Sequence, residues 1–256
     1  MNGALLARGL QVRLGGREIL HGIDIGPWRA GEVTALLGPN GSGKSTLLRA
    51  LAGLVPVHGH VQLGDAVVTG AATRGSTVYL PQALPAGVHL RVLESVLAAA
   101  HAGSGRKVEP AEAMALLASL GIDGLAMLFL DQLSGGQRQL AGLAQALVRR
   151  PSVLLLDEPL SALDLNHQLQ VMRMVAAETR ARGMVTAIVL HDLNVALRFA
   201  DEAVMLRQGR VEAAGPVAKV ISPATVERVY RVTARLEPCS QGRPQLIVDE
   251  ALSEGR

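Results

Sequence analysis

Aromatic residues, cysteine and long apolar runs are all scarce in this sequence of 256 residues. Phe, Trp and Tyr together make up 2% of the chain, whereas proteins that bind single-stranded nucleic acid stack bases on aromatic side chains. The arginines are scattered and the formal net charge is only +3, so nucleic acid is not an expected partner. The single cysteine, Cys239, cannot form an internal disulfide, which is consistent with a reducing compartment.

The apolar segments are too short to cross a membrane. Runs such as VLLL and AIVL are followed at once by polar residues, whereas a spanning helix needs roughly 20 apolar residues. Any contact with a membrane is therefore expected to require another subunit. The first residues, MNGALLARGL, lack the pattern of a secretory signal, so a cytoplasmic location is expected.

What the sequence has is an alternation of strand-like and helix-like segments. Apolar runs at VTALL, VLLL and TAIVL are each followed by a helical pattern, which indicates an α/β fold with a parallel sheet covered on both faces. The segment 202–215, EAVMLRQGRVEAAG, predicts a hairpin that turns at Gln208–Gly209.

The middle of the chain has a different pattern. Residues from about 91 to 148 are rich in Ala and Leu, and Leu140, Leu143, Ala144 and Leu147 recur at the spacing of a helix with one buried stripe. We therefore expect a helical insertion in the α/β core, at about 83–148.

The stretch GPNGSGKST has the pattern of a phosphate-binding loop between a strand and a helix. Its glycines let successive N–H groups point at phosphate oxygens, Lys44 reaches the β- and γ-phosphates, and Ser45 can ligate Mg²⁺. The sequence thus predicts a site for a nucleoside triphosphate with Mg²⁺. The candidate nucleotide-binding residues are Gly38, Pro39, Asn40, Gly41, Ser42, Gly43, Lys44, Ser45 and Thr46.

Two acidic residues follow the apolar run VLLL. Acids at the carboxyl end of such a strand lie at the crevice where α/β sheets bind ligands. Asp157 is the candidate Mg²⁺ ligand. Glu158 is expected to point the other way, as the next residue of a period-2 strand, and is the candidate general base for an attacking water.

A second glycine-rich loop, LSGGQ at 133–137, precedes the helix QRQLAGLAQALVRR. Ser134 and Gln137 have the spacing of a capping box, so a well-capped helix is one explanation. Two adjacent glycines exceed what capping needs, and they allow a ligand to approach the backbone closely.

LSGGQ between a phosphate loop and LLLDEP resembles the signature of ATP-binding-cassette ATPases, and the resemblance covers nearly the whole chain. It implies a P-loop NTPase (RecA-like) core with an N-terminal antiparallel β-subdomain and an inserted α-helical subdomain. The cassette would span 1–236, followed by a short C-terminal hairpin or tail at 237–256.

The resemblance also implies that the signature serves the ATP of a neighbouring subunit, in a head-to-tail homodimer with two shared sites. Gln82 in STVYLPQ resembles the glutamine that senses the γ-phosphate end and ligates Mg²⁺, and His191 in AIVLHDL resembles the histidine that contacts the γ-phosphate. With Glu158 they form the implied catalytic set. The residues implied to act across the subunit boundary are Ser134, Gly135, Gly136, Gln137 and Asp164.

The stretches LSGGQRQLAGLAQALVR, HDLNVALRFAD and GPVAKVISPATVERVY narrow the resemblance to ATPase subunits of importers for iron–siderophore, haem or cobalamin. This implies separate membrane permease chains, contacted near Gln82 and 83–100, and an extracytoplasmic substrate-binding protein. The subunit would lie peripherally on the cytoplasmic face of the inner membrane. The alternative is a soluble cassette ATPase of DNA repair, translation or cluster assembly, although such proteins generally carry tandem cassettes, coiled coils or basic surfaces.

One position departs from the family pattern. Where the resemblance implies an aromatic residue that stacks on adenine, this sequence has Leu14. Stacking is worth about 1–3 kcal/mol per base, so we expect weak discrimination for adenine.

Overall fold

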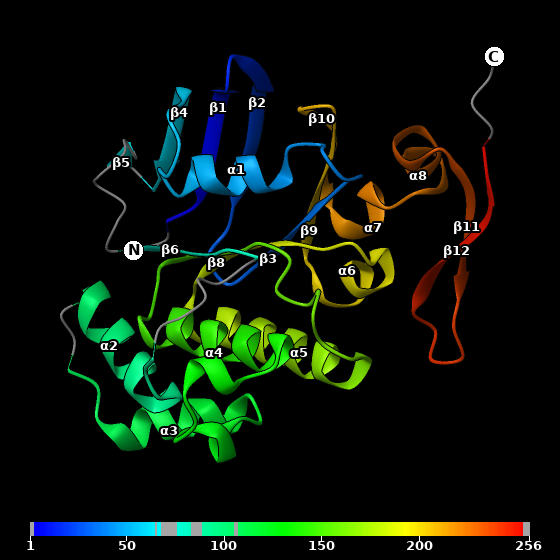
Figure 1. Cartoon of the computed structure of the whole chain (residues 1–256). Helices are drawn as coiled ribbons and strands as arrows, with labels where there is room; N and C mark the ends of the chain where they lie inside the picture. Colours follow the sequence, from blue (N-terminus) through cyan, green and yellow to red (C-terminus); the bar gives the residue numbers. More distant parts are fainter. Residues whose placement is uncertain (1–2, 65, 68–75, 83–88, 105–106, 253–256) are drawn as a thin grey trace.

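The computed structural model describes residues 3–64, 66–67, 76–82, 89–104 and 107–252. Figure 1 shows an antiparallel sheet at the top, a second sheet seen nearly edge-on below helix α1, and helices beneath that sheet. Among the described residues, no helix has the length and apolar character needed to span a bilayer.

The central sheet has six strands in the order β10-β9-β3-β8-β7-β6. All neighbours pair in parallel except β10, which is antiparallel to β9. Every residue of β3, β7 and β8 is buried, as expected for a sheet covered on both faces. The strands are β3 (Val33–Leu37), β6 (Thr77–Leu80), β7 (Val153–Leu156), β8 (Val185–Val189), β9 (Glu202–Arg207) and β10 (Arg210–Pro216).

Alternate residues of these strands enter two separate hydrophobic clusters. In β7, Val153 and Leu155 join the cluster under the N-terminal sheet, whereas Leu154 and Leu156 join the cluster with the helical insertion. The period-2 geometry of a strand sends successive side chains to opposite faces. The central sheet is therefore the partition between the two cores.

The N-terminal sheet is antiparallel and covers one side of helix α1, Lys44–Leu51. Leu47 and Leu51 of α1 are buried in one cluster with Leu10 and Leu20 of the sheet. This packing fixes the helix that follows the phosphate loop. The strands are β1 (Leu5–Leu14), β2 (Arg17–Trp28), β4 (His58–Leu63) and β5 (Ala66–Val67), in the order β2-β1-β4-β5.

The helical insertion lies between β6 and β7 on the other side of the central sheet (Figure 1). The predicted stripe on α4 is confirmed, since Leu140, Leu143, Ala144 and Leu147 are all buried. Residues 83–88 and 105–106 of the expected insertion are outside the described residues. The helices on this side include α2 (Val92–Ser104), α3 (Pro110–Ser119), α4 (Gly135–Val148) and α5 (Leu165–Arg182), with short 3₁₀ helices η2 (Asp123–Leu125) and η3 (Leu130–Gln132).

The C-terminal part contains two hairpins. The predicted β9–β10 hairpin is confirmed, with positive φ at both Gln208 and Gly209, as two-residue hairpin turns of this kind require. The second hairpin, β11–β12, begins at Val232, before the range 237–256 in which a C-terminal hairpin or tail was expected. Residues 253–256 are outside the described residues. The remaining elements are α6 (Leu193–Phe199), α7 (Val217–Val220), α8 (Pro223–Tyr230), β11 (Val232–Pro238) and β12 (Pro244–Ala251).

The architecture agrees with the sequence-based prediction. The α/β core, the N-terminal antiparallel sheet and the helices between β6 and β7 are all present. Strands β3, β7 and β8 all end, at their carboxyl termini, next to the candidate site residues. The fold thus brings together segments that are far apart in the sequence.

Candidate functional site

In the loop between β3 and α1, two positions have a backbone conformation and surroundings that only glycine fits. Gly38 has φ +135, and a Cβ there would lie 2.1 Å from the carbonyl oxygen of Leu206. Gly43 has φ +103, and a Cβ there would lie 2.8 Å from Leu20 Cδ2. Helix α1 starts directly after Gly43, and no side chain of the described residues caps it. The first N–H groups of α1 are therefore available to an anion.

Lys44 is buried inside this loop. Its Nζ donates to the carbonyl oxygens of Gly38 at 2.7 Å and Pro39 at 3.0 Å. Burial lowers the pKa of Lys44, while the nearby carboxylates of Glu158 and Asp157 act in the opposite direction. The ammonium group is thus held at the loop and faces two negative charges.

The first peptide of the loop is also fixed from the far end of the chain. The N–H of Gly38 donates to the hydroxyl oxygen of Tyr230, the last residue of α8, at 2.8 Å. Burial raises the pKa of Tyr230 to about 12, so its hydroxyl stays protonated at ordinary pH. The sequence patterns did not predict this contact: Tyr230 ends the stretch GPVAKVISPATVERVY, but the resemblance gave it no role at the phosphate loop.

Asp157 is held by two hydroxyl groups. Its Oδ1 accepts a hydrogen bond from Ser45 Oγ at 2.9 Å, and its Oδ2 accepts one from the Tyr79 hydroxyl at 2.9 Å. Ser45 and Asp157, the two candidate Mg²⁺ ligands from the sequence, are thus paired with each other. Burial, with the charge of Asp157, raises the pKa of Tyr79. Tyr79 is a second residue that the sequence patterns missed.

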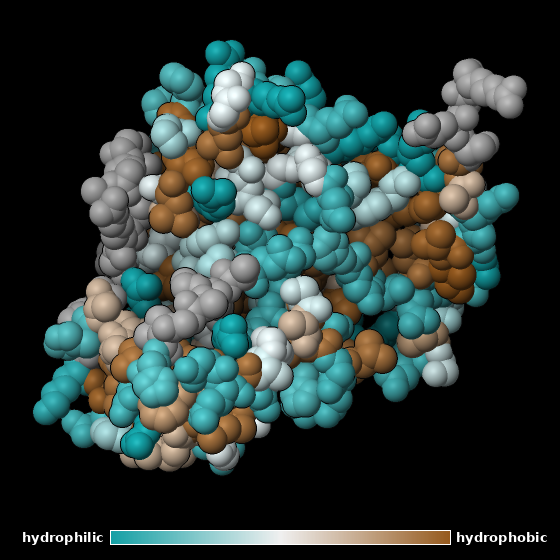
Figure 2. Space-filling view, viewed as in Figure 1, coloured by the Kyte–Doolittle hydropathy of each residue, from teal (hydrophilic) through white to brown (hydrophobic). Residues whose placement is uncertain are grey.

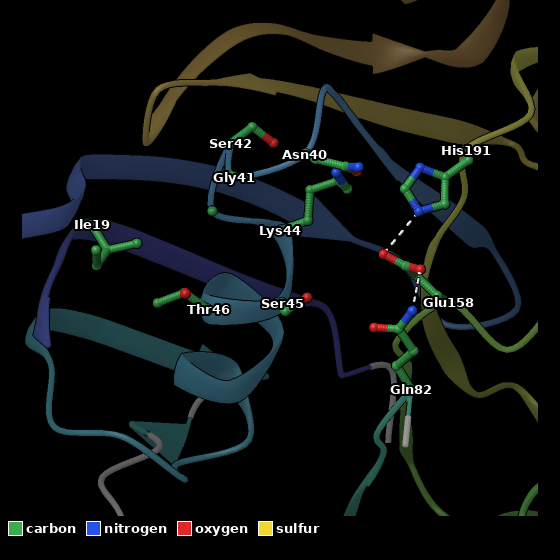
Figure 3. A pocket seen from close by; sticks show the side chains of 11 residues that line it. Ile19, Asn40, Gly41, Ser42, Lys44, Ser45, Thr46, Gln82, Glu158 and His191 are labelled. Atoms are coloured by element: carbon green, nitrogen blue, oxygen red, sulfur yellow. Dashed lines mark hydrogen bonds and ion pairs between the residues drawn. The ribbon is translucent and has the colours of Figure 1, made fainter. Parts of the chain in front are cut away.

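Glu158 joins the other two candidate catalytic residues. Its Oε2 accepts a hydrogen bond from Gln82 Nε2 at 2.7 Å, and its Oε1 lies 2.8 Å from His191 Nε2. Figure 3 shows the carboxylate between these two side chains, across the cavity from the phosphate loop. The side chain of His191 is 48% exposed and that of Glu158 only 16%. The imidazole therefore covers the carboxylate from the solvent side.

The direction of Glu158 has a different origin from the one expected. The sequence predicted that it would point away from Asp157 by strand alternation, but β7 ends at Leu156. Glu158 has a φ of 49°, in the left-handed region. The two carboxylates have different partners because the backbone turns between them.

These groups surround one cavity of about 510 Å³. Its lining combines the phosphate loop with the three candidate catalytic residues, and one apolar residue of β2 closes one end (Figure 3). Leu14, the expected adenine position, is not among the lining residues, whereas Ile19 is. The lining residues are Ile19, Asn40, Gly41, Ser42, Gly43, Lys44, Ser45, Thr46, Gln82, Glu158 and His191.

The second glycine loop is separate from this cavity. Ser134 Oγ accepts a hydrogen bond from Gln137 N at 3.3 Å, and Gln137 Oε1 accepts one from Ser134 N at 3.0 Å. The capping box considered from the sequence is therefore present. Ser134 and Gly135 are exposed, and none of residues 134–137 is among the described residues that line the cavity.

Only one of the two signature glycines is required by the packing of its own chain. A Cβ on Gly136 would lie 2.7 Å from the carbonyl oxygen of Ala162, whereas one on Gly135 would be in ordinary contact, 3.8 Å from Ala162 Cβ. The loop 161–164 thus packs directly on the start of α4. The glycine at 135 has no such explanation within the described chain.

Asp164 caps helix α5. Its Oδ1 accepts a hydrogen bond from the backbone N–H of His167 at 2.9 Å, and both carboxylate oxygens lie 2.9 Å from His167 Nδ1. The backbone N–H of His167 is the largest influence that lowers the pKa of Asp164. An exposed helix cap is therefore the role that the structure gives to this residue.

The residues present fit a nucleotide phosphate with a divalent cation. The first N–H groups of α1, which no side chain of the described residues caps, are open to an anion, and a buried lysine stands beside them. A hydroxyl and a carboxylate 2.9 Å apart supply the hard oxygen ligands that Mg²⁺ prefers. The donor set therefore agrees with the sequence-based interpretation.

Comparison with known proteins supports the same interpretation. Residues 27–161 match the family model described as "ABC transporter". The chain is 40% identical over 252 residues to the "Hemin import ATP-binding protein HmuV" of Streptomyces coelicolor, covering 94% of this chain and 88% of that protein. It is 36% identical over 262 residues to the protein of the same name from Rhizobium etli, covering 96% and 97%.

Solved structures have the same fold. The ATP-binding cassette MJ1267 of an ABC transporter, in its ADP conformation, aligns with a TM-score of 0.77 at 25% identity and covers 89% of this chain and 98% of that one. A metal-chelate type ABC transporter in an inward-facing conformation aligns with a TM-score of 0.79 at 24% identity, covering 96% and 98%. The P-loop NTPase fold is thus confirmed. The chain belongs to the ATP-binding subunits of ABC transporters, and its activity is ATP hydrolysis coupled to transport.

Proposed function

We propose that this protein is the ATPase subunit of an importer for haem or a related metal chelate. The single observation that carries this proposal is the extent of its similarity, 40% identity over 94% of the chain, to a protein named for hemin import. The structural likeness to a solved metal-chelate type transporter shows that the fold is shared. Iron–siderophore and cobalamin complexes are the other members of this class.

In the proposed reaction, ATP is the substrate and the loop 38–46 holds its phosphates. The open N–H groups at the start of α1 and the ammonium of Lys44 bind the β- and γ-phosphate oxygens. Ser45, Asp157 and Gln82 would hold Mg²⁺. When bound, the ion neutralises charge that develops on the phosphate oxygens.

Glu158 is the proposed general base. It would orient the attacking water and take its proton. In the structure both carboxylate oxygens already have partners, Gln82 and His191. Each carboxylate oxygen can accept more than one hydrogen bond, so the base can act on water, and it does so more readily when one of these two side chains turns to another acceptor. The γ-phosphate offers such an acceptor to His191.

We further propose a head-to-tail homodimer. Residues 134–137 lie at the surface, outside the cavity that contains the phosphate loop. In the dimer, the signature of one subunit, with Asp164 nearby, would close over the ATP of the other. Each subunit contributes one loop of each kind, so the dimer has two sites. Turnover per subunit is then expected to rise with protein concentration.

The proposed partner in the membrane is a permease that docks on the helical insertion. Figure 2 shows apolar residues at the surface over this part of the molecule, lower left, among polar ones. Leu90, Met127 and Leu128 are 37%, 60% and 41% exposed, beside a stacked pair of rings, His89 and Phe129. Of this group, His89 and Leu90 follow Gln82 closely in the chain, although 83–88 are outside the described residues.

The experiment that tests this function reconstitutes the protein with the proposed permease partner, in liposomes. The subunit is expected to bind the cytoplasmic face peripherally, and an extracytoplasmic binding protein delivers the substrate. Binding protein loaded with haem should stimulate ATP hydrolysis more than the same protein mixed with a ferric siderophore or cobalamin. If none of the three substrates stimulated ATP hydrolysis, the proposed substrate class would be contradicted. Co-purification with ribosomes or DNA, and with no membrane protein, would contradict the transport function.

A further inference from the structure

Gln139 is a buried glutamine one helical turn after Gly135, the first residue of α4. It lies within the stretch LSGGQRQLAGLAQALVR, but the resemblance assigned it no role. It is 6% exposed. Its Nε2 donates to the backbone carbonyl of Glu158 at 2.8 Å, and its Oε1 accepts from the N–H of Ala162 at 3.2 Å. A longer contact of 3.5 Å joins the same nitrogen to Ser161 Oγ. Both ends of the amide therefore contact the segment that runs from the proposed base to Ala162.

The backbone that Gln139 contacts is in an unusual conformation. Glu158 has a φ of 49°, which is sterically unfavourable for a residue with a Cβ. Such a conformation persists where the surrounding structure fixes it. The carbonyl oxygen of Glu158 accepts from the Ser161 hydroxyl at 3.1 Å and from Ser161 N at 3.3 Å. These two donors belong to the same turn as Glu158.

Gln139 is the donor that comes from a different element. It lies on α4, which begins at Gly135, so about one turn separates it from the surface loop of the signature. The distance from the start of α4 to the loop 161–164 is also short, because Ala162 packs against Gly136. A shift of α4 would therefore carry the amide of Gln139 and the peptide of Glu158 together.

We infer that Gln139 is a positioning residue, which holds the backbone of Glu158 so that its carboxylate stands at the cavity, and which couples that carboxylate to the signature helix. The inference rests on the proposed role of Glu158 as general base. Gln139 does not line the cavity, so it acts through Glu158. Docking of a second subunit on residues 134–137 would then be transmitted to the base over a single helical turn.

A purely structural role for Gln139 makes a different prediction. A buried and satisfied amide stabilises the fold wherever it lies, and its loss lowers stability without selecting one kinetic step. The same helix contains a matched control, Gln145, which is partly buried and donates through Nε2 to Ser95 Oγ at 2.9 Å. That bond joins α4 to α2, away from the cavity.

The experiment compares Gln139→Met with Gln145→Met in the full-length protein. Both variants keep side-chain length and lose an amide. We expect Gln139→Met to lower kcat about ten- to a hundredfold, since a small displacement of a catalytic group has an effect of this size. The KM for ATP should stay within about twofold, because the phosphate contacts are unchanged. Gln145→Met should lower the melting temperature with kcat unchanged.

Two further variants separate this inference from the function on which it rests. In a Glu158→Gln background, Gln139→Met should cause no further loss of rate, because residues that act as a unit are not additive. Ser161→Ala, at an exposed residue, removes a weaker donor to the same carbonyl and should lower kcat by a few fold even if Gln139→Met fails to fold.

The outcomes are distinct. If Glu158→Gln hydrolyses ATP at the parent rate, the proposed role of Glu158 fails. If Glu158→Gln is inactive but Gln139→Met keeps the parent kcat, the inference alone fails. It also fails if Gln145→Met lowers kcat as much as Gln139→Met, or if KM rises while kcat is unchanged. An unaltered kcat in Ser161→Ala would likewise contradict the importance of the Glu158 carbonyl.

Discussion

The two glycine-rich loops of this protein, 38–46 and 133–137, are similar in composition and opposite in their surroundings. In the first, Ser42 and Lys44 are 2% and 5% exposed and the loop lines a cavity. In the second, Ser134 and Gly135 are exposed, and the polar groups of Ser134 and Gln137 satisfy each other. The first loop is buried or partly buried by its own chain except at Asn40 and Gly41, whereas the second is exposed at Ser134 and Gly135.

The glycines of the two loops are explained differently as well. Gly38 and Gly43 are required by positive φ and by atoms of the same chain. At the second loop, Gly136 is required by Ala162, but Gly135 has only an ordinary contact. A glycine that its own fold does not require is available for close approach by another molecule. The comparison therefore supports one loop that binds within the subunit and one that acts between subunits.

The largest expected effect is on ATP turnover when the second glycine-rich loop, 133–137, is blocked; this is called the outer loop. Ser134→Arg places a long cation at an exposed position that the proposed partner subunit must cover. Hydrolysis should fall by about a hundredfold or more, because half of each shared site is displaced. Binding of ATP to the dilute protein, measured by equilibrium titration, should be unchanged. Normal turnover with a normal concentration dependence would contradict the shared site.

The converse substitution is in the first glycine-rich loop, 38–46, which is called the inner loop. Lys44→Ala removes a charge-assisted contact to phosphate, which is worth about 1.5–3 kcal/mol, so ATP affinity should fall about ten- to a hundredfold. The same titration detects this loss in the dilute protein, where Ser134→Arg has no effect. If the two variants had the same binding defect, the proposed division between the loops would be wrong.

A pair of substitutions distinguishes the two signature glycines. Gly136→Ala introduces a Cβ 2.7 Å from a backbone oxygen, and overpacking of this kind costs about 1–3 kcal/mol. Its melting temperature should therefore fall. Gly135→Ala meets only an ordinary contact, so its melting temperature should equal that of the parent or exceed it, while turnover decreases. A loss of stability in Gly135→Ala, with full turnover, would mean that this glycine also serves its own fold.

The smallest expected effect is at the anchor of the inner loop. Tyr230→Phe leaves the N–H of Gly38 without its acceptor, and we expect the Kd for ATP to rise about fivefold. The stabilisation by saturating ATP, measured by thermal unfolding, should then decrease by about 1 kcal/mol. Val229→Ala, at a buried residue of the same helix, is the control, because it should lower stability with and without ATP equally. An unchanged ATP-dependent shift in Tyr230→Phe would limit Tyr230 to a structural role.

Local sequence patterns predicted most of the site because they follow from short-range geometry. The loop of 38–46 needs glycine at fixed spacing before a helix, and the acids after VLLL lie at the carboxyl end of a buried strand. The stripe on α4 and the turn at Gln208–Gly209 were predictable for the same reason. Such features depend on residues a few positions apart.

The contacts that the patterns missed join distant parts of the chain. Tyr79 reaches Asp157 from 78 positions away, and Tyr230 reaches Gly38 from 192 positions away. Ile19 lines the cavity, whereas Leu14, to which the family resemblance drew attention, is not among the lining residues. The direction of Glu158 was predicted from strand alternation, but a backbone turn produces it.

The sequence by itself determined which chemical groups this protein carries and in what order, and hence its family. The tertiary structure decided which of those groups touch: Glu158 between Gln82 and His191, and the amide of Gln139 on the backbone of the same residue. The physical reason is that hydrogen-bond partners across a parallel sheet are set by strand order and by helix packing. Those depend on the whole buried core, and no short segment of the chain specifies them.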